Sequence, residues 1–289
     1  MREFVITTES NSDLPVEYLE ENGIEVIPHY YNVENQVYGG ERHLSNHEFY
    51  NEMRREKTVG TTASNPAVIE EVFERYARKN MDVLHISFSS ALSSGYNNVM
   101  VEAKLLREDF PMMRIEVFDT LNVSLGEGLF IMKAVNLKKE GKSIDEIVKL
   151  LTKLRSHVHT LFTVEDLKYL YRGGRITRSS QILGNVMQLK PIIHVDSDGK
   201  LTALTKIRGR KKSMVTLVDY MEESMGRFQN LQEMIGVVHG DCEQEANNLA
   251  TMIKARFGYE YVLVCPIGPS IGAHSGPGAV GIIYLGEEK

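Results

Sequence analysis

One histidine near the end of the chain, His274, lies in a stretch built mainly of small residues. The stretch covers residues 268–278 and contains four glycines, two prolines and two serines. Glycine leaves no side chain in the way, so backbone amides, hydroxyls and the imidazole can approach a bound molecule closely. This composition predicts a ligand-binding loop. The simpler alternative is a glycine-rich corner between two strands, over residues 261–267 and 279–285.

Three further stretches rich in hydroxyl side chains each precede a predicted helix. They contain Ser10 and Ser12, then Thr61 and Thr62, then Ser89, Ser90 and Ser93. Each stretch could be no more than a helix cap, which is a common use of serine and threonine. If all three follow strands of one parallel sheet, they meet at its carboxyl edge. Hydroxyl groups and helix N-termini at such an edge suit an anionic ligand.

Two basic clusters could supply a cation to that ligand. Residues 172–175 read Arg-Gly-Gly-Arg, and residues 208–212 read Arg-Gly-Arg-Lys-Lys. A guanidinium group pairs well with a carboxylate or a phosphate, although a solvated surface is the ordinary place for such clusters. RNA binding is disfavoured, because no aromatic residue is interleaved with either cluster and the formal net charge is −6.

A hydrolase is an alternative reading of the same residues. Ser93, Asp119 and His274 occur in the order of the α/β-hydrolase triad, and Ser93 lies between a predicted strand and a predicted helix. The first glycine of the nucleophile elbow is missing, since Ala91 stands in its place. A lipid esterase that uses Ser93 and His274 therefore stays open as an alternative, as does a carrier of a different anionic ligand.

The sequence contains none of the common motifs for nucleotide, dinucleotide or metal-dependent chemistry. There is no Walker A lysine motif, no GxGxxG after a strand, no HExxH and no cysteine-rich metal site, so we expect neither a cofactor nor a metal ion. The two cysteines, Cys242 and Cys265, are far apart, which argues against a disulfide framework. The N-terminus lacks the features of a signal peptide, and no apolar run could span a bilayer. We expect a cytoplasmic protein without stable membrane insertion.

Strands and helices alternate in the first half of the chain, which must position most of these hydroxyl groups. Apolar, β-type runs are predicted over 4–8, 24–33, 82–88 and 114–118, and helices over 15–22, 45–57, 67–79, 96–108 and 124–139. Ser45 and, further along, Ser143 are predicted as N-caps. Residues 60–65 are predicted as a loop before the third helix. This alternation is typical of a parallel sheet that binds ligands beyond the carboxyl ends of its strands.

The pattern changes after residue 155, which we take as the domain boundary. Strands are predicted over 161–164, 190–195, 201–207, 234–238, 261–267 and 279–285, and helices over 144–155, 165–171, 179–187, 211–228 and 243–257. The Asp-Gly pair within 196–199 predicts a hairpin. The sequence thus predicts a parallel α/β domain over residues 1–155 and a mixed, largely antiparallel α/β domain over residues 156–289.

Several motifs together resemble one known family along the whole chain. They are Thr-Glu-Ser-Asn-Ser-Asp-Leu-Pro at 8–15, Thr61-Thr62, Ser-Ser-Ala-Leu-Ser at 89–93, Asp119-Thr120, Leu-Tyr-Arg-Gly-Gly-Arg-Ile at 170–176, Lys-Pro-Ile at 190–192, Ile-Arg-Gly-Arg-Lys-Lys at 207–212 and the stretch 267–278. In this order they resemble the DegV family, the fatty-acid-binding proteins that serve as the FakB-type subunit of bacterial fatty acid kinase. The chain departs from the family pattern at Asn11-Ser12, at Ser94-Gly95, where Gly-Thr is usual, and at Gly209.

The resemblance implies a Rossmann-like (DegV/EDD-type) first lobe, a mixed second lobe and a tunnel between them for the acyl chain. It implies a carrier that has no catalytic residue of its own and presents the fatty acid carboxylate to a separate ATP-dependent kinase, for acyl phosphate formation in phospholipid metabolism. The implied carboxylate ligands are Thr61, Thr62, Ser93, Arg172, Arg208 and His274. Ser12 and Gly272 are secondary candidates. His274 is expected to donate hydrogen bonds and to pair with charge.

Elementary energetics agree with that implication. Sheltering about fifteen methylene groups at ~0.8 kcal/mol each gives on the order of 12 kcal/mol before the costs of association. An unpaired carboxylate would cost several kcal/mol to bury, so its site needs hydroxyl donors and at least one cation.

Overall fold

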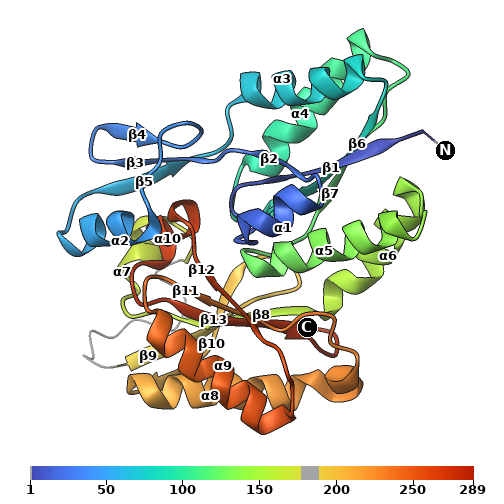
Figure 1. Cartoon of the computed structure of the whole chain (residues 1–289). Helices are drawn as coiled ribbons and strands as arrows, with labels where there is room; N and C mark the ends of the chain where they lie inside the picture. Colours follow the sequence, from blue (N-terminus) through green and yellow to red (C-terminus); the bar gives the residue numbers. More distant parts are fainter. Residues whose placement is uncertain (1, 177–188) are drawn as a thin grey trace.

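The first part of the chain builds a parallel sheet covered by helices on both faces. The computed structural model describes residues 2–176 and 189–289 (Figure 1). The sheet has the strand order β2-β1-β6-β7, and all its pairs are parallel. Its strands are β1 (Phe4–Glu9), β2 (Glu25–Ile27), β6 (Asp82–Ser87) and β7 (Ile115–Asp119). Its helices are α1 (Val16–Glu21), α3 (Pro66–Arg78), α4 (Gly95–Asp109), α5 (Leu125–Lys139) and α6 (Ile144–Leu154).

A separate three-stranded antiparallel sheet corrects two predictions. It has the order β4-β3-β5, with β3 (Tyr30–Val33), β4 (Gln36–Tyr38) and β5 (Val59–Thr62). The single run predicted over 24–33 is split, because Pro28 has no amide to continue a ladder. The loop predicted over 60–65 is wrong at its start, since Thr61 pairs with Tyr31 in this sheet. Three of the four residues of β5 are β-branched, which favours a strand.

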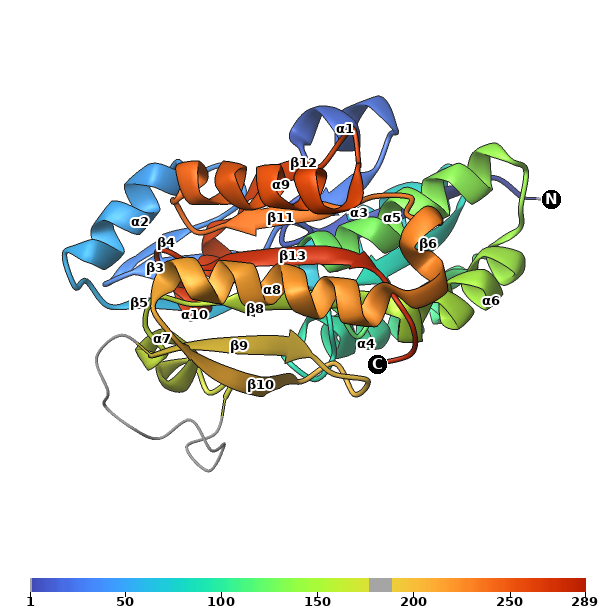
Figure 2. The ribbon, with the colours of Figure 1, turned by 90° about the horizontal axis from the view of Figure 1, so that it is seen from below.

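The second part is a six-stranded mixed sheet of order β10-β9-β8-β13-β11-β12. Among its described strands, β11 and β12 are the one neighbouring pair that is parallel. Its strands are β8 (Val158–Thr163), β9 (Leu189–Val195), β10 (Leu201–Arg208), β11 (Gly236–His239), β12 (Leu263–Pro266) and β13 (Val280–Leu285). The predicted hairpin joins β9 to β10. Helices α8 (Arg210–Met225) and α9 (Glu243–Phe257) cover one face (Figure 2). The predicted fold class, a parallel α/β part followed by a mixed part, is confirmed.

Helix α5 joins the two large sheets. It contacts β1 and β6 of the parallel sheet and β8, β11 and β13 of the mixed sheet (Figure 1). A helix with protein on all sides must be apolar nearly all round. The sequence of α5 meets this condition, because every residue from Leu125 to Ile131 is buried, Glu127 included. One core cluster therefore runs continuously from the parallel sheet to the mixed sheet.

The stretch predicted as a glycine-rich loop near the C-terminus is largely helical. Helix α10 (Pro269–Ser275) starts with a proline at its first turn and ends at Gly276, whose φ is +78°. It packs against α2 (Asn46–Arg54), α7 (Lys168–Arg172), β3 and β5. Ser45 and Ser143 cap α2 and α6 with full capping boxes, as predicted. The short 3-10 helices η1 (Arg155–His157) and η2 (Gly226–Asn230) complete the described elements, and the helix predicted over 179–187 lies outside them.

Candidate functional site

A cavity lies where β5, α7 and α10 meet the carboxyl ends of the parallel strands and one face of the mixed sheet. Half of its described lining is apolar: Phe88, Leu92, Val123, Phe162, Leu170, Leu201, Val238, Ile267, Ile271 and Ala279. The other half carries polar side chains: Asn11, His29, Thr61, Ser93, Ser124, Thr160, Arg175, Ser270, His274 and Ser275. It offers about 90 Å³ to the centres of water-sized groups, several times what one water molecule needs. This lining suits a molecule with a long apolar part and a small polar end.

Thr61 and His274 form the first polar pair of this cavity. The Oγ1 atom of Thr61, on β5, lies 2.8 Å from Nε2 of His274, on α10. The Nδ1 atom of His274 is buried against Gly173 and has no hydrogen-bond partner among the described residues. The pair holds the imidazole in one orientation at the cavity wall. Two residues 213 positions apart are thus brought together by the packing of α10 on β5.

The His274 imidazole is neutral at neutral pH. Burial, together with the nearby Arg175 guanidinium, lowers the pKa of His274 to about 4. A neutral ring exchanges hydrogen bonds, and the expected pairing of His274 with a charged group stays a prediction. Burial is the larger cause of the lowered pKa, and the Arg175 guanidinium adds to it.

Ser93 supplies a second hydroxyl group to the cavity. It follows β6 and precedes α4, and its Oγ accepts a hydrogen bond of 3.1 Å from the amide of Gly95. Accepting this bond fixes the position of the oxygen while the hydroxyl hydrogen can still be donated to a ligand. Ser93 thus fits the hydroxyl role that was predicted for it.

The arginine at the cavity is Arg175, which the sequence prediction missed. Arg175 lines the cavity and donates to the backbone carbonyls of Leu92, at 3.1 Å, and Gly173. Within residues 2–176 and 189–289 it forms no ion pair with a carboxylate. Burial lowers its pKa, as it does for any cation that is taken out of water. An anionic ligand would give this half-buried guanidinium its counter-charge.

The two predicted arginines lie elsewhere. Arg172 is exposed and lines a second pocket, which shares Thr61, Arg175 and His274 with the cavity. Arg208 is exposed at the end of β10 and is not among the described lining residues. The signal that separates Arg175 from Arg172 is the chain reversal at Gly174, whose φ of +70° turns the following residue inward.

The remaining predicted residues stand outside the cavity lining that the structure describes. Thr62 is exposed at the end of β5, and Ser12 is buried beside a groove next to α1. Gly272 is a packing residue, because a Cβ there would lie 2.5 Å from the Tyr50 hydroxyl oxygen. That hydroxyl donates to the carbonyl of Ile267. Gly272 and Tyr50 thus hold α10 in place, and none of Thr62, Ser12 and Gly272 is among the described residues that line the cavity.

Buried polar atoms without partners mark residues that sequence reasoning did not select. Asn11 Oδ1, His29 Nε2 and Ser275 Oγ line the cavity and have no hydrogen-bond partner among the described residues. Buried polar atoms are nearly always paired, so such a group around one cavity points to a bound polar group. Asn11 belongs to a quoted motif, but nothing in the sequence marks His29.

The hydrolase triad is not assembled. His274 Nε2 is bonded to Thr61, and Ser93 Oγ is bonded to the Gly95 amide. Asp119 accepts hydrogen bonds from the amides of Ser90, at 3.2 Å, and Leu121, at 3.0 Å. Among the described residues no hydrogen bond links Ser93, Asp119 and His274, so the geometry gives no support to an esterase.

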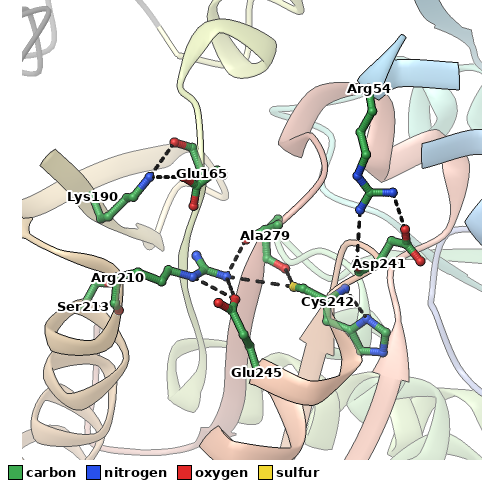
Figure 3. A network of polar contacts seen from close by, with 11 residues as sticks. Arg54, Glu165, Lys190, Arg210, Ser213, Asp241, Cys242, Glu245 and Ala279 are labelled. Carbon is green, nitrogen blue, oxygen red and sulfur yellow. Dashed lines mark hydrogen bonds and ion pairs between the residues drawn. The ribbon is translucent and has the colours of Figure 1, made fainter. Parts of the chain in front are cut away.

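Part of the second basic cluster is structural. Figure 3 shows that Arg210, at the start of α8, forms an ion pair with Glu245 of α9. Arg210 also donates to the carbonyl of Gly278, at 2.6 Å. Nearby, Arg54 of α2 pairs with Asp241 in the turn after β11. These contacts tie α2, α8 and α9 to the segment that carries α10 into β13.

Residues 2–176 and 189–289 contain no group of three or more histidine, cysteine, aspartate or glutamate residues placed to hold a metal ion. No helix in this part of the chain is both long and apolar enough to cross a membrane.

Comparison with known proteins gives one consistent match over the full chain. A family model described as an uncharacterised protein of the DegV family matches residues 3–287. A DegV domain-containing protein of Clostridium perfringens is 34% identical over 292 residues, which cover 100% of this chain and 99% of that protein.

Solved structures agree with the sequence match. A DegV family protein of Thermus thermophilus, described as binding fatty acid, has a TM-score of 0.87 and 26% identity over 99% of this chain and 100% of its own. DegV of Bacillus subtilis, described as a fatty acid binding protein, has a TM-score of 0.86 and 25% identity over 99% and 100%. Together with the family model, these matches place the chain in the DegV family.

Proposed function

We propose that the protein binds a long-chain fatty acid, with the acyl chain in the cavity between two lobes, residues 1–155 and 156–289. The carboxylate would accept hydrogen bonds from Thr61 and Ser93, with His274 beside them, and would pair with Arg175. The observation that carries the proposal is the composition of one cavity. Its apolar wall leads to two hydroxyl groups and an arginine that has no carboxylate partner within the described residues.

Two relatives support this choice over other anionic ligands. The Thermus and Bacillus proteins are both described as binding fatty acid. A nucleotide or a small sugar phosphate would leave the apolar wall uncovered, whereas each methylene group placed against it contributes ~0.8 kcal/mol. The apolar half of the lining therefore favours an acyl chain.

We further propose that the protein is a FakB-type carrier in the bacterial cytoplasm. Thr61, Arg175 and His274 also line the second pocket, through which a kinase could reach the carboxylate. A separate ATP-dependent fatty acid kinase would then form the acyl phosphate, and this chain would supply no catalytic group and no cofactor.

Calorimetric titration with palmitate tests the binding step. We expect stoichiometric binding to the wild-type protein, and weaker binding once both Thr61→Val and Ser93→Ala are present. Equal binding by this double variant would show that the carboxylate lies elsewhere. For the second step, a fatty acid kinase with ATP should form acyl phosphate only when the carrier is added. Hydrolysis of lipid esters by the wild-type protein, lost in Ser93→Ala, would instead establish the esterase.

A further inference from the structure

A histidine that has no assigned role lies beside Ser93. His29 is 7% exposed, lines the cavity and follows β2 directly after Pro28. Its backbone amide donates to Ser10 Oγ at 3.0 Å, which fixes the segment. Its Nε2 atom is buried and has no hydrogen-bond partner among the residues that the structure describes. Because buried polar atoms are nearly always paired, this nitrogen is expected to form a hydrogen bond with a polar group of a bound ligand.

Three polar atoms from separate segments surround the first residue of α4. A Cβ added to Gly95 would lie 3.0 Å from Glu9 Oε1, 3.3 Å from His29 Nε2 and 3.4 Å from Ser93 Oγ. The carboxylate of Glu9, the His29 ring and the Ser93 hydroxyl therefore share one small space. A ligand carboxylate that binds Ser93 must come close to the carboxylate of Glu9.

Glu9 is a fully buried carboxylate that stays ionised. Burial alone would raise its pKa, but the interaction with His85 and the hydrogen bond from the amide of Phe88 lower it below the usual value. The Ser87 hydroxyl donates to Oε1 at 3.0 Å, and the Phe88 amide donates to Oε2 at 3.2 Å. Two ionised carboxylates at such close range in a buried site repel each other, so a proton is needed between them.

The other titratable groups nearby cannot supply that proton as directly. His85 of β6 lies on the far side of Glu9, with its Nε2 3.5 Å from Glu9 Oε2. Glu127 of α5 cannot carry a positive charge. Burial and the neighbouring Glu9 raise the pKa of its carboxyl group well above the usual value. Arg175 is a permanent cation, and His274 is kept neutral by its burial and, to a smaller extent, by Arg175. Among the described residues, His29 is the titratable cation-forming group that adjoins both Glu9 and Ser93 at Gly95.

We infer that His29 is a further ligand of the carboxyl group and takes up a proton when the fatty acid binds. The inference rests on the proposed function. Before binding, the ring is neutral, because burial lowers its pKa more than the charge of Glu9 raises it. A second carboxylate beside the ring favours the imidazolium form, which can donate its Nε2 hydrogen to the ligand. The proton comes from solvent, so the affinity falls as the pH rises.

Calorimetry with palmitate in two buffers of different ionisation enthalpy measures this proton. For the wild-type protein near neutral pH we expect uptake of about one proton per ligand and a loss of about tenfold in affinity per pH unit. His29→Gln should lose the uptake and bind at least several-fold more weakly. The exposed His43 offers a matched control, and His43→Gln should behave like the wild-type protein.

The outcomes separate the inference from the proposed function. If palmitate does not bind the wild-type protein, the proposed function fails and the inference falls with it. If palmitate binds without proton uptake, or if His29→Gln keeps the uptake, only the inference is overturned. If His29→Gln fails to fold, the pH dependence of hexadecanol binding to the wild-type protein tests the inference instead. An alcohol brings no carboxylate, so its binding should be independent of pH, whereas an equal pH dependence for hexadecanol and palmitate would contradict the inference.

Discussion

At the scale of single residues, the candidate site is made of groups that lie far apart in the chain. Thr61 and His274 touch across 213 positions, and Ser93 and Arg175 reach the same cavity from other segments. Each is held by a local contact: Ser93 by the Gly95 amide and Arg175 by two backbone carbonyls. The polar end of the cavity is thus fixed before a ligand arrives, which reduces the ordering cost of binding.

Loss of one hydroxyl group should weaken fatty acid binding moderately. We expect Thr61→Val and Ser93→Ala each to reduce palmitate affinity by roughly fivefold, since one hydrogen bond contributes about 1 kcal/mol. Thr62→Val is the matched control, because Thr62 is the exposed neighbour on the same strand. Calorimetric titration measures all three, and a loss in Thr62→Val as large as in Thr61→Val would contradict the site.

The arginines give a sharper contrast. Arg175→Ala should reduce palmitate affinity by roughly tenfold to a hundredfold, because a hydrogen bond to a charged group contributes about 1.5–3 kcal/mol. Arg208→Ala should have no measurable effect, since Arg208 is exposed at the end of β10. If Arg208→Ala loses more affinity than Arg175→Ala, the carboxylate does not bind where we place it.

At the scale of elements, the placement of α10 decides where His274 lies. Its neighbours approach so closely that glycine is required at the contacts. A Cβ on Gly173 would lie 2.1 Å from His274 Nδ1, and one on Gly276 would lie 2.2 Å from the Tyr169 ring. Helix α7 and helix α10 therefore pack with backbone against side chain, and the imidazole has little freedom to move.

Substitution of Gly173 tests this packing. Gly173→Ala should push His274 away from Thr61, lowering palmitate affinity and costing about 1–3 kcal/mol of unfolding free energy. Gly258→Ala is the control, because Gly258 follows α9, its φ of +76° makes alanine strained, and a Cβ there meets nothing within 4 Å. Gly258→Ala should lose stability but keep affinity. Denaturant unfolding and titration separate the two, and full affinity in Gly173→Ala would refute the role of the contact.

Asp13 joins three elements and gives the fold a pH dependence. It accepts hydrogen bonds from the Gly268 amide before α10, at 2.8 Å, and from the Ser124 hydroxyl before α5. Burial raises the pKa of Asp13 to about 7, although the Ser124 hydroxyl and the Gly268 amide lower it in part. The folded protein then holds a proton that the unfolded chain releases at about pH 4.

The sign of the effect follows from this difference in proton binding. The contribution of Asp13 to stability is complete below about pH 4 and is lost as the pH rises towards 7, at up to ~1.4 kcal/mol per pH unit. Buried His274 acts oppositely, losing stability as the pH falls from 6.5 to about 4. Asp13→Asn should remove only the first effect. The difference in unfolding free energy between the wild-type protein and Asp13→Asn should therefore change with pH over this range, and a constant difference would contradict the assignment.

The sequence predicted elements well where local signals decide and poorly where tertiary packing decides. Capping boxes at Ser45 and Ser143 and the Asp-Gly hairpin are local, and all three are present. Residues 59–62 form a strand only because β3 lies beside them, and residues 269–275 form a helix because α2, α7 and β5 surround it. The glycines of residues 268–278 predicted a flexible binding loop, whereas in the structure they allow close packing around α10.

The same limit applies to the candidate site. Thr61, Ser93 and His274 were selected from motifs, and the structure brings them to one cavity, while their role in binding stays a prediction. Arg172 and Arg175 flank the same pair of glycines, so only the turn at Gly174 decides which arginine faces inward. His29 has no motif at all. The position of His29 depends on the packing of β2, β1 and α4, and a short sequence motif cannot predict that packing.

At the scale of the whole molecule, helix α5 and one continuous core hold the two large sheets together around the cavity. The proposed ligand would fill this cavity and add to that core. A ligand at a hundred times its dissociation constant stabilises the folded state by about 2.7 kcal/mol, so the filled protein should unfold at a higher temperature than the empty one.

Mass spectrometry of the natively purified protein tests the central claim most directly. We expect the intact protein to carry one extra mass that matches a long-chain fatty acid, and extraction with organic solvent to release that acid. The double variant with Thr61→Val and Ser93→Ala, purified in the same way, should carry much less. Repeated preparations in which the wild-type protein holds no acyl chain and takes up none from added palmitate would contradict the account.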